Sequence, residues 1–284
     1  MFSKRRDAKL IKGKNIGFDR FLYYLKPRRS DSEVYISREI DVTNLKKYID
    51  LKKESGKKIT YFHAFSTAIA KVIYNRPYLN RFIIKGNKYE RNEVKLSFVA
   101  KADFTDDSNE FMNVITVDKK DNLNTISKTI TGDVEKIRSN NKGNSADNLV
   151  ITLGKLPKWL FAFIVWIIKR LDNNDLLPSS LTNNSLYHST IILSNLGSIH
   201  CGAIYHNLTN FGTNSILATM GEVKEVAKVI DGKIEKRWVC DFGITLDERI
   251  ADGVYYAKAV NLLEYILDNP KMLEGDCNDK INME

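Results

Sequence analysis

The sequence is poor in cysteine and lacks a long hydrophobic run. Cys201, Cys240 and Cys277 are far apart and form no CxxC pair, so we expect neither zinc binding nor a disulfide framework, and a reducing cytoplasmic compartment fits best. The N-terminus, MFSKRRDAKL, lacks the apolar stretch of a secretory signal. The apolar segment WLFAFIVWII (159–168) is far shorter than the roughly 20 residues that span a bilayer. We expect a buried or interface helix at 156–171, with a monotopic membrane contact as the alternative.

Several chemical signatures are also missing. The sequence has no glycine-rich phosphate loop, no Rossmann fingerprint, no repeat of solenoid period and no cluster of metal-ligand residues. Lys plus Arg number 44 and Asp plus Glu 35, a net charge of +9, but the basic residues are scattered apart from a short KRR near the N-terminus. We therefore expect neither a nucleic-acid partner nor a metal. An anionic ligand such as a phosphorylated cofactor suits the charge.

The sequence does have the composition of a globular protein, with alternating helix and strand patterns. Hydrophobic residues make up 43% and charged residues 28%, which is typical of a folded chain of this length. We expect one α+β domain over residues 1–284, with its core at about 34–272 and mainly antiparallel strand pairing. The clearest elements are a helix capped by Thr60 that ends before Pro77, hairpins at Gly86-Asn87 and Asp231-Gly232, and a last helix at 253–268.

The other expected elements are less sharply bounded. We expect a helix capped by Thr43 and a polar helix at 122–138. The best loop candidate is SNNKGNSADN at 139–148. The remaining expected strands lie at 34–42, 94–102, 189–193, 215–220, 224–230 and 233–245.

Three stretches occur in an order that is characteristic of one family. They are a helix and hairpin ending in RPYLNRFII, then TIILSNLGSIHCGAIYHNL followed by TNSILATMGEV, and finally DERIADG at 247–253. The order and spacing resemble the catalytic domain of dihydrolipoyl acyltransferases, the cores of 2-oxoacid dehydrogenase complexes and relatives of chloramphenicol acetyltransferase. The resemblance implies a chloramphenicol acetyltransferase-like two-layer fold with a mainly antiparallel mixed sheet. It also implies a homotrimer that binds coenzyme A thioesters in a channel between subunits.

The resemblance also implies roles for individual residues. The family motif is D-H-R-x-x-D-G, whose histidine is the general base, and here Glu248 stands in its place. Asp252 corresponds to the structural aspartate that holds the loop. Ser194, in SNLG, is the expected hydroxyl donor to the tetrahedral oxyanion, with Thr190 as the alternative.

Replacing histidine by glutamate changes the acid–base chemistry. A glutamate in water titrates near pH 4.3 and a histidine near 6.5, so Glu248 needs burial in an apolar cleft to act as a base at neutral pH. Loss of a general base typically costs about 10²–10⁴ in rate. We therefore hypothesise that His206, rather than His200, meets Glu248 across the subunit interface, with the carboxylate orienting the imidazole. Simpler interpretations remain for each residue: surface charge for Glu248, helix cap for Asp252, turn residue for Ser194 and ordinary polar residue for His206.

The expected function is a stand-alone acyltransferase of this type. It would pass an acyl group between coenzyme A and an unidentified thiol, hydroxyl or amine acceptor, without a lipoyl or subunit-binding domain, a covalent lipoyl group or a metal. A lipoyl carrier or a dehydrogenase complex is the candidate protein partner. The alternative is a catalytically silent trimeric scaffold or regulatory relative that keeps the fold.

Overall fold

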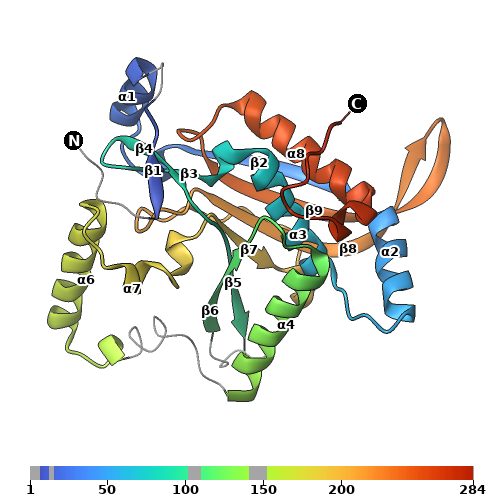
Figure 1. Ribbon diagram of the computed structural model, residues 1–284, viewed down its shortest axis with the longest axis horizontal. Helices are drawn as coiled ribbons and strands as arrows, with labels where there is room; N and C mark the ends of the chain where they lie inside the picture. Colours follow the sequence, from blue (N-terminus) through green and yellow to red (C-terminus); the bar gives the residue numbers. More distant parts are fainter. Residues whose placement is uncertain (1–6, 13–15, 102–109, 141–151, 284) are drawn as a thin grey trace.

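A six-stranded mixed sheet is the centre of the computed structural model, which describes residues 7–12, 16–101, 110–140 and 152–283 (Figure 1). The strand order is β2-β9-β8-β7-β5-β6. Strand β7 runs parallel to both neighbours, β5 and β8, and the other pairs are antiparallel. The bounds are β2 Glu33–Asp41, β5 Val94–Lys101, β6 Glu110–Val117, β7 Ile191–Asn195, β8 Ile216–Ile230 and β9 Lys233–Asp247. A small sheet, β1-β4-β3, consists of β1 Ala8–Leu10, β4 Asn87–Arg91 and β3 Arg81–Ile84.

Four helices pack with the main sheet around one hydrophobic core. They are α2 Thr43–Glu54, α3 Tyr61–Asn75, α4 Leu123–Asn140 and α8 Gly253–Asp268. Helix α3 is buried along nearly its whole length, from His63 to Ile73. Its start is fixed by Thr60, whose hydroxyl accepts a hydrogen bond from the His63 amide at 3.3 Å. The expected helix-on-sheet arrangement is therefore confirmed.

The other face of the sheet is covered by a chain segment that leaves β7 and crosses β8 and β9 toward β2. We call residues 202–208 the crossing segment. A Cβ atom at Gly221 of β8 would lie 2.6 Å from the Ala203 nitrogen, and one at Gly243 of β9 would lie 2.7 Å from the Ile204 oxygen. Only glycine lets the crossing segment approach the sheet this closely. At its end, the Leu208 amide donates to Glu33 Oε1 on β2 at 2.6 Å.

Among the described residues, helices α1 Ile16–Leu25 and α6 Lys158–Asn173 lie outside the main core (Figure 1). Asp172 is the one buried residue of α6, so the apolar run expected to be a buried or interface helix lies at the surface of this chain. The short helix α7 Ser179–Thr182 follows it. In the described part of the chain, no helix combines the length and apolar character needed to cross a membrane. The 3₁₀ turns are η1 Arg29–Asp31, η2 Pro77–Asn80, η3 Leu186–His188, η4 Gly197–Ile199 and η5 Pro270–Glu274.

Most expected elements are present, with differences that have local causes. Helix α8 has the expected bounds, and Asp231 and Gly232 form the expected turn with positive φ values of 48° and 77°. Two expected strands, 215–220 and 224–230, are one strand, β8, interrupted only by an irregularity between Met220 and Val223. Thr43 is the first helical residue rather than the cap, and its amide donates to Asp41 at 2.9 Å. Most of the expected loop at 139–148 lies outside the described residues.

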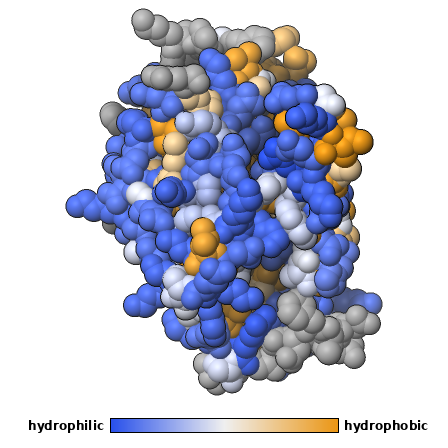
Figure 2. All heavy atoms as spheres, turned by 90° about the vertical axis from the view of Figure 1, so that its right-hand side faces the viewer, coloured by the Kyte–Doolittle hydropathy of each residue, from blue (hydrophilic) through white to orange (hydrophobic). Residues whose placement is uncertain are grey.

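The face that carries α2 and the outer end of β8 and β9 is largely hydrophilic (Figure 2). Hydrophobic side chains form only small spots there. Helix α6 is on the opposite side of the molecule, and its aromatic side chains Trp159, Phe163 and Trp166 are 73%, 53% and 61% exposed.

Candidate active site

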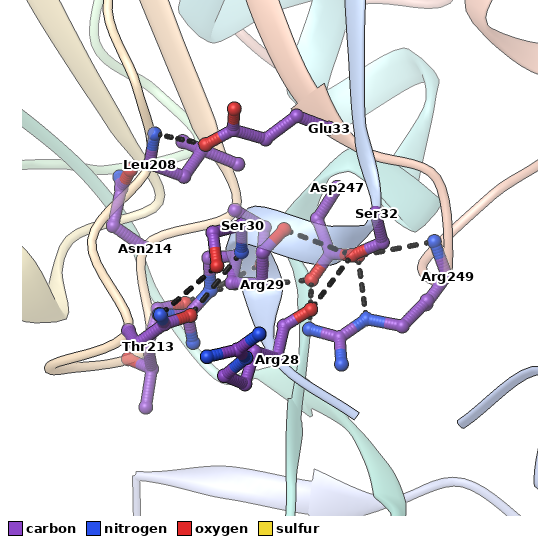
Figure 3. Close-up of polar contacts among 12 residues, drawn as sticks. Arg28, Arg29, Ser30, Ser32, Glu33, Leu208, Thr213, Asn214, Asp247 and Arg249 are labelled. Carbon is purple, nitrogen blue, oxygen red and sulfur yellow. Dashed lines mark hydrogen bonds and ion pairs between the residues drawn. The ribbon is translucent and has the colours of Figure 1, made fainter. Parts of the chain in front are cut away.

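The turn between β9 and α8, which carries DERIADG, is organised by a buried ion pair. Asp247 is fully buried and ends β9. Its Oδ1 accepts from Arg249 Nε at 2.8 Å and from Ser32 Oγ at 2.9 Å, and its Oδ2 accepts from Arg249 Nη2 at 2.7 Å (Figure 3). This two-pronged contact of guanidinium and carboxylate fixes the direction of the chain through the turn.

Arg249 and Arg29 connect this turn to other parts of the chain. Arg249 Nη1 donates to the carbonyl oxygens of Lys26 and Pro27 at 3.0 and 3.1 Å. Arg29 Nε lies 3.9 Å from Asp247 Oδ2, and its Nη2 donates to the Gly212 oxygen at 2.9 Å. Burial lowers the pKa of the Arg29 guanidinium, and the nearby Asp247 carboxylate acts in the opposite direction. The segment before β2 therefore holds both the motif turn and the loop at 209–212.

Glu248 lies on the outer side of this turn. Its side chain is 31% exposed and forms an ion pair with Lys26, which follows α1. Its amide donates to the Ser32 oxygen at 3.0 Å. Within the single chain, Glu248 is therefore partnered by a lysine rather than a histidine.

Ser194 lies near the end of β7, opposite Thr219 of β8. It is half-buried, and within the described part of the chain no hydrogen bond of its hydroxyl is observed. Thr190, the alternative oxyanion donor, is fully buried. Its hydroxyl donates to Asn80 Oδ1 at 2.7 Å and accepts from the Lys95 amide at 3.0 Å. Because Thr190 already has both partners, Ser194 has the more available hydroxyl.

The two histidines near the crossing segment are both exposed. His206 Nδ1 is 3.2 Å from the Asn207 carbonyl oxygen, and its neighbour Tyr205 packs edge-on against Tyr35 of β2. His200 Nδ1 is 2.8 Å from Glu222 Oε1. The structure thus gives His200 a carboxylate partner of its own and leaves His206 with a backbone contact.

Asp252 caps α8. Its side chain accepts from the Tyr255 amide at 2.8 Å and is exposed. The carboxylate that ties the turn to the rest of the chain is Asp247, which sequence reasoning did not single out. The sequence did contain a signal for Asp247 and Arg249, because both flank Glu248 in the motif. Arg29 and Ser32 are distant in sequence, and no pattern connects them to the motif.

A second buried polar group holds the loop at 209–212 from the other side. Asp172 Oδ2 accepts from the Gly212 amide at 2.7 Å. Its Oδ1 is 3.0 Å from His188 Nε2, and His188 Nδ1 is 3.0 Å from Ser185 Oγ. Gly212 has a φ of 82°, and a Cβ there would collide with the Tyr187 backbone. The loop is therefore held at Gly212 by Asp172 and Arg29 together.

A cavity of about 510 Å³ lies beside the motif turn. Arg249 reaches it from the motif, and Asn210 and Gly212 reach it from the loop at 209–212. Its other lining residues include Arg28, Arg29, Lys85, Lys169 and Asp172. Basic side chains outnumber the single acidic one, so the cavity suits an anionic group. No group of three or more metal-binding side chains was found within the described ranges.

Comparisons with solved structures define the class of fold. A probable dihydrolipoamide acetyltransferase from Listeria monocytogenes 4b F2365 matches with a TM-score of 0.59 and 17% identity, covering 97% of each chain. The Azotobacter vinelandii dihydrolipoamide acetyltransferase matches with a TM-score of 0.59 and 16% identity over 96% of this chain and 94% of that chain. A chloramphenicol acetyltransferase matches with a TM-score of 0.52 and 12% identity over 92% and 99%. The fold is that of the chloramphenicol acetyltransferase-like acyltransferases.

Sequence comparison finds similarity to one family over part of the chain. Residues 168–274 match the model of the 2-oxoacid dehydrogenases acyltransferase (catalytic domain), a range that includes Ser194 and Glu248. The chain is also 23% identical over 251 residues to the lipoamide acyltransferase component of the branched-chain alpha-keto acid dehydrogenase complex of Bacillus subtilis (strain 168). That match covers 85% of this chain and 49% of the relative, so the chain spans about half the relative's length. The expected resemblance is confirmed: the family model matches the C-terminal part of the chain, and the relative is an acyltransferase component of the expected kind.

Proposed function

We propose that this protein is a coenzyme A-dependent acyltransferase that moves an acyl group to or from a thiol, hydroxyl or amine acceptor. The observation that carries the proposal is the motif turn, in which the buried Asp247–Arg249 pair fixes the backbone that presents Glu248. The family match over the same residues supports it. The basic cavity reached by Arg249 offers a place for coenzyme A phosphates.

The proposed chemistry divides between two parts of the fold. The Ser194 hydroxyl donates to the oxyanion that forms when the acceptor attacks the thioester carbonyl. Proton removal from the acceptor belongs to Glu248 acting with His206, the carboxylate orienting the imidazole, and the imidazolium returns the proton to the coenzyme A thiolate that leaves. The Lys26 ion pair must open for this contact, which costs little because a partly exposed pair is worth only about 0–1 kcal/mol.

We further propose that the working assembly is a homotrimer in which His206 of one subunit meets Glu248 of the next. Both side chains are accessible, and their segments are held at the start of β2: the Leu208 amide donates to Glu33 Oε1, and the Glu248 amide donates to the oxygen of Ser32, which precedes β2. Next to Lys26, the end of α1 exposes Phe21, Tyr24 and Leu25. An exposed apolar group of this kind beside the motif turn suits a subunit contact.

A mixed-subunit experiment tests this arrangement. His206→Ala and Glu248→Gln should each lower kcat by about 10²–10⁴ in pure trimers. When the two variants are co-expressed in equal amounts and co-purified through two different tags, every recovered trimer contains both variants, and about one third of the interfaces join an intact His206 to an intact Glu248. We expect a corresponding fraction of wild-type activity to return. No recovery, with both variants folded and assembled, would contradict a site shared between subunits.

His200→Ala is the matched control, because His200 is exposed like His206 but pairs with Glu222. It should leave kcat within a factor of about two, as expected for an exposed residue outside the chemistry.

If wild-type protein is stabilised against heat by acetyl-coenzyme A yet turns over no acceptor, the silent relative is the better description. A lipoyl carrier supplied in trans is the first acceptor to try, because the Bacillus subtilis relative is the lipoamide acyltransferase component of a branched-chain alpha-keto acid dehydrogenase complex. All three cysteines are free, and a reducing cytosol is the proposed compartment.

A second candidate function is contact with an anionic membrane surface through α6. Its outer face exposes Trp159, Phe163 and Trp166, and basic residues stand at both ends of the helix: Lys155, Lys158, Lys169 and Arg170. Aromatic and basic groups together favour the interface of anionic lipid. Co-sedimentation with phosphatidylserine vesicles should be lost in Trp159→Ser/Trp166→Ser and kept in Ile234→Ser, which removes an exposed apolar side chain elsewhere. Equal sedimentation of both variants would contradict it.

A further inference from the structure

The inner side of α6 lines a cavity that the proposed chemistry does not use. This cavity has a volume of about 500 Å³, and its wall is mainly apolar. Its apolar lining includes Met112, Phe161, Val165, Ile168, Leu177 and Leu181. A concave space of a few hundred cubic ångströms with an apolar wall and a few polar groups is typical of a small-molecule site.

This cavity adjoins the basic cavity beside the motif turn. Lys169 and Asn210 line both spaces. Arg249 lines the basic cavity, so the motif turn borders a space that adjoins the apolar cavity. Together the two cavities offer an apolar space with the cationic side chain of Lys169 at its edge.

The apolar side chains of α6 that face the cavity are not packed into the hydrophobic core. Among the helix residues only Asp172 is buried, and its contacts with His188 and Gly212 anchor one end of the helix. Phe161, Val165 and Ile168 face the cavity instead of packing into the core. Removing apolar surface from water is worth roughly 25 cal/mol per Å², so a nonpolar ligand in this space would gain from the surface that α6 leaves uncovered.

We propose that this cavity binds the aliphatic chain of an anionic amphiphile, either a fatty acid or a fatty acyl thioester, with its anionic end toward Lys169. For the thioester, the inference rests on the proposed function and names the acyl class that the site accepts. The chain lies under α6, and the phosphates or carboxylate lie in the basic cavity that Arg249 reaches. Acyl groups longer than acetyl are then the preferred cargo.

Binding of saturated fatty acids from six to twelve carbons, measured by displacement of a fluorescent fatty acid, tests the chain site directly. Affinity should rise about fourfold for each added methylene until the cavity is filled. Val165→Trp places a bulky ring in the cavity and should weaken dodecanoate binding at least tenfold. Ala162→Trp is the matched control, because Ala162 is exposed on the same helix and does not line the cavity. Affinity independent of chain length, or equal in the two variants, would overturn the proposal.

The role of the cationic Lys169 side chain is tested separately. Lys169→Gln should weaken dodecanoate binding several-fold and leave dodecanol binding unchanged, whereas Arg170→Gln, altering the adjacent exposed residue, should change neither. Equal losses for acid and alcohol would overturn the assigned orientation. Dodecanoate and dodecanoyl-coenzyme A, compared side by side, distinguish a fatty acid ligand from a thioester ligand.

The two proposals fail separately. Chain-length-dependent binding without transfer to any acceptor would overturn the proposed function and keep the chain site. Transfer from acetyl-coenzyme A at full rate, with no binding of longer chains, would do the reverse.

Discussion

At the residue scale, Asp247 rather than Asp252 connects the motif turn to the rest of the molecule. Asp247 is fully buried and contacts Arg249 and Ser32, with Arg29 beside it. Asp252 is exposed and contacts the first turn of α8. The two carboxylates of one motif therefore contribute to stability through different physics, buried charge pairing for the first and helix capping for the second.

Substitution should reveal this difference. Asp247→Asn removes the negative charge between two buried arginines and should cost about 3–5 kcal/mol of unfolding free energy, because an uncompensated buried charge is left. Asp252→Ala should cost about 1 kcal/mol, the usual value for a lost N-cap. Urea unfolding followed by circular dichroism measures both. If Asp252→Ala were the more damaging change, the assignment of the buried pair would be incorrect.

His63 makes the fold sensitive to acid. Burial in α3 lowers its pKa from 6.5 to about 4. Between these values the unfolded chain binds a proton that the folded chain does not, so stability contributed by neutral His63 is complete above pH 6.5 and falls as the pH is lowered toward 4. At pH 5 the loss from this residue should be about 2 kcal/mol.

The check is the free energy of unfolding at pH 7.5 and pH 5 for wild type and His63→Gln. The glutamine variant should lose less stability over this interval. His200→Gln serves as control, since the His200 side chain is 84% exposed, and it should follow wild type. Identical pH dependence in wild type and His63→Gln would show that the buried imidazole is not the sensitive group.

At the element scale, the path of the crossing segment depends on glycine in the strands below it. The Thr219 hydroxyl hydrogen-bonds with both the amide and the carbonyl oxygen of Ile204. Gly243 leaves room for that carbonyl. Because His206 follows two residues later, the close approach at Gly243 also sets the place of the proposed catalytic histidine.

Gly243→Ala should therefore destabilise the protein by about 1–3 kcal/mol through overpacking, and it should also lower transfer activity by displacing the crossing segment. Gly132→Ala, in α4, is the same chemical change where nothing lies within 4 Å of the new methyl group. It should stabilise the protein by about 0.5–1 kcal/mol, because alanine is the better helix former. Thermal unfolding of both variants tests the pair, and equal signs would contradict the close approach.

The sequence predicted elements well where local chemistry decides and less well where distant contacts decide. Thr60, Pro77 and the Asp231-Gly232 turn act within a few residues, and the elements that they bound appear as expected. The apolar run in α6 gave no sign that the rest of the chain would leave it exposed, because hydrophobicity alone does not specify the surface it packs against.

The same holds for the site. The motif order led to Ser194, Glu248 and Asp252, but Arg29 and Ser32 come from another region and bear no recognisable pattern. Lys26, the observed partner of Glu248, was likewise not foreseen, because ion pairs across more than 200 residues depend on the tertiary structure.

At the scale of the whole molecule, the proposed trimer makes activity depend on protein concentration. Sedimentation equilibrium should give three times the 32.6 kDa chain mass. Phe21→Ser/Leu25→Ser, which removes exposed apolar side chains beside the motif turn, should shift the equilibrium to monomers and reduce transfer in proportion. Full activity in a monomeric variant would contradict a shared site.

The outer half of the β8–β9 hairpin has a practical consequence. Strand β7 pairs with β8 only as far as Met220, and β2 pairs with β9 only from Val239, so the residues between them form a two-stranded ribbon that projects from the body (Figure 1). Its tip, Asp231-Gly232, is solvent-exposed and distant in topology from the motif turn. Exposed loop tips tolerate inserted sequence well. A fluorescent label or a fused reporter placed there would follow the protein in cells without disturbing its core.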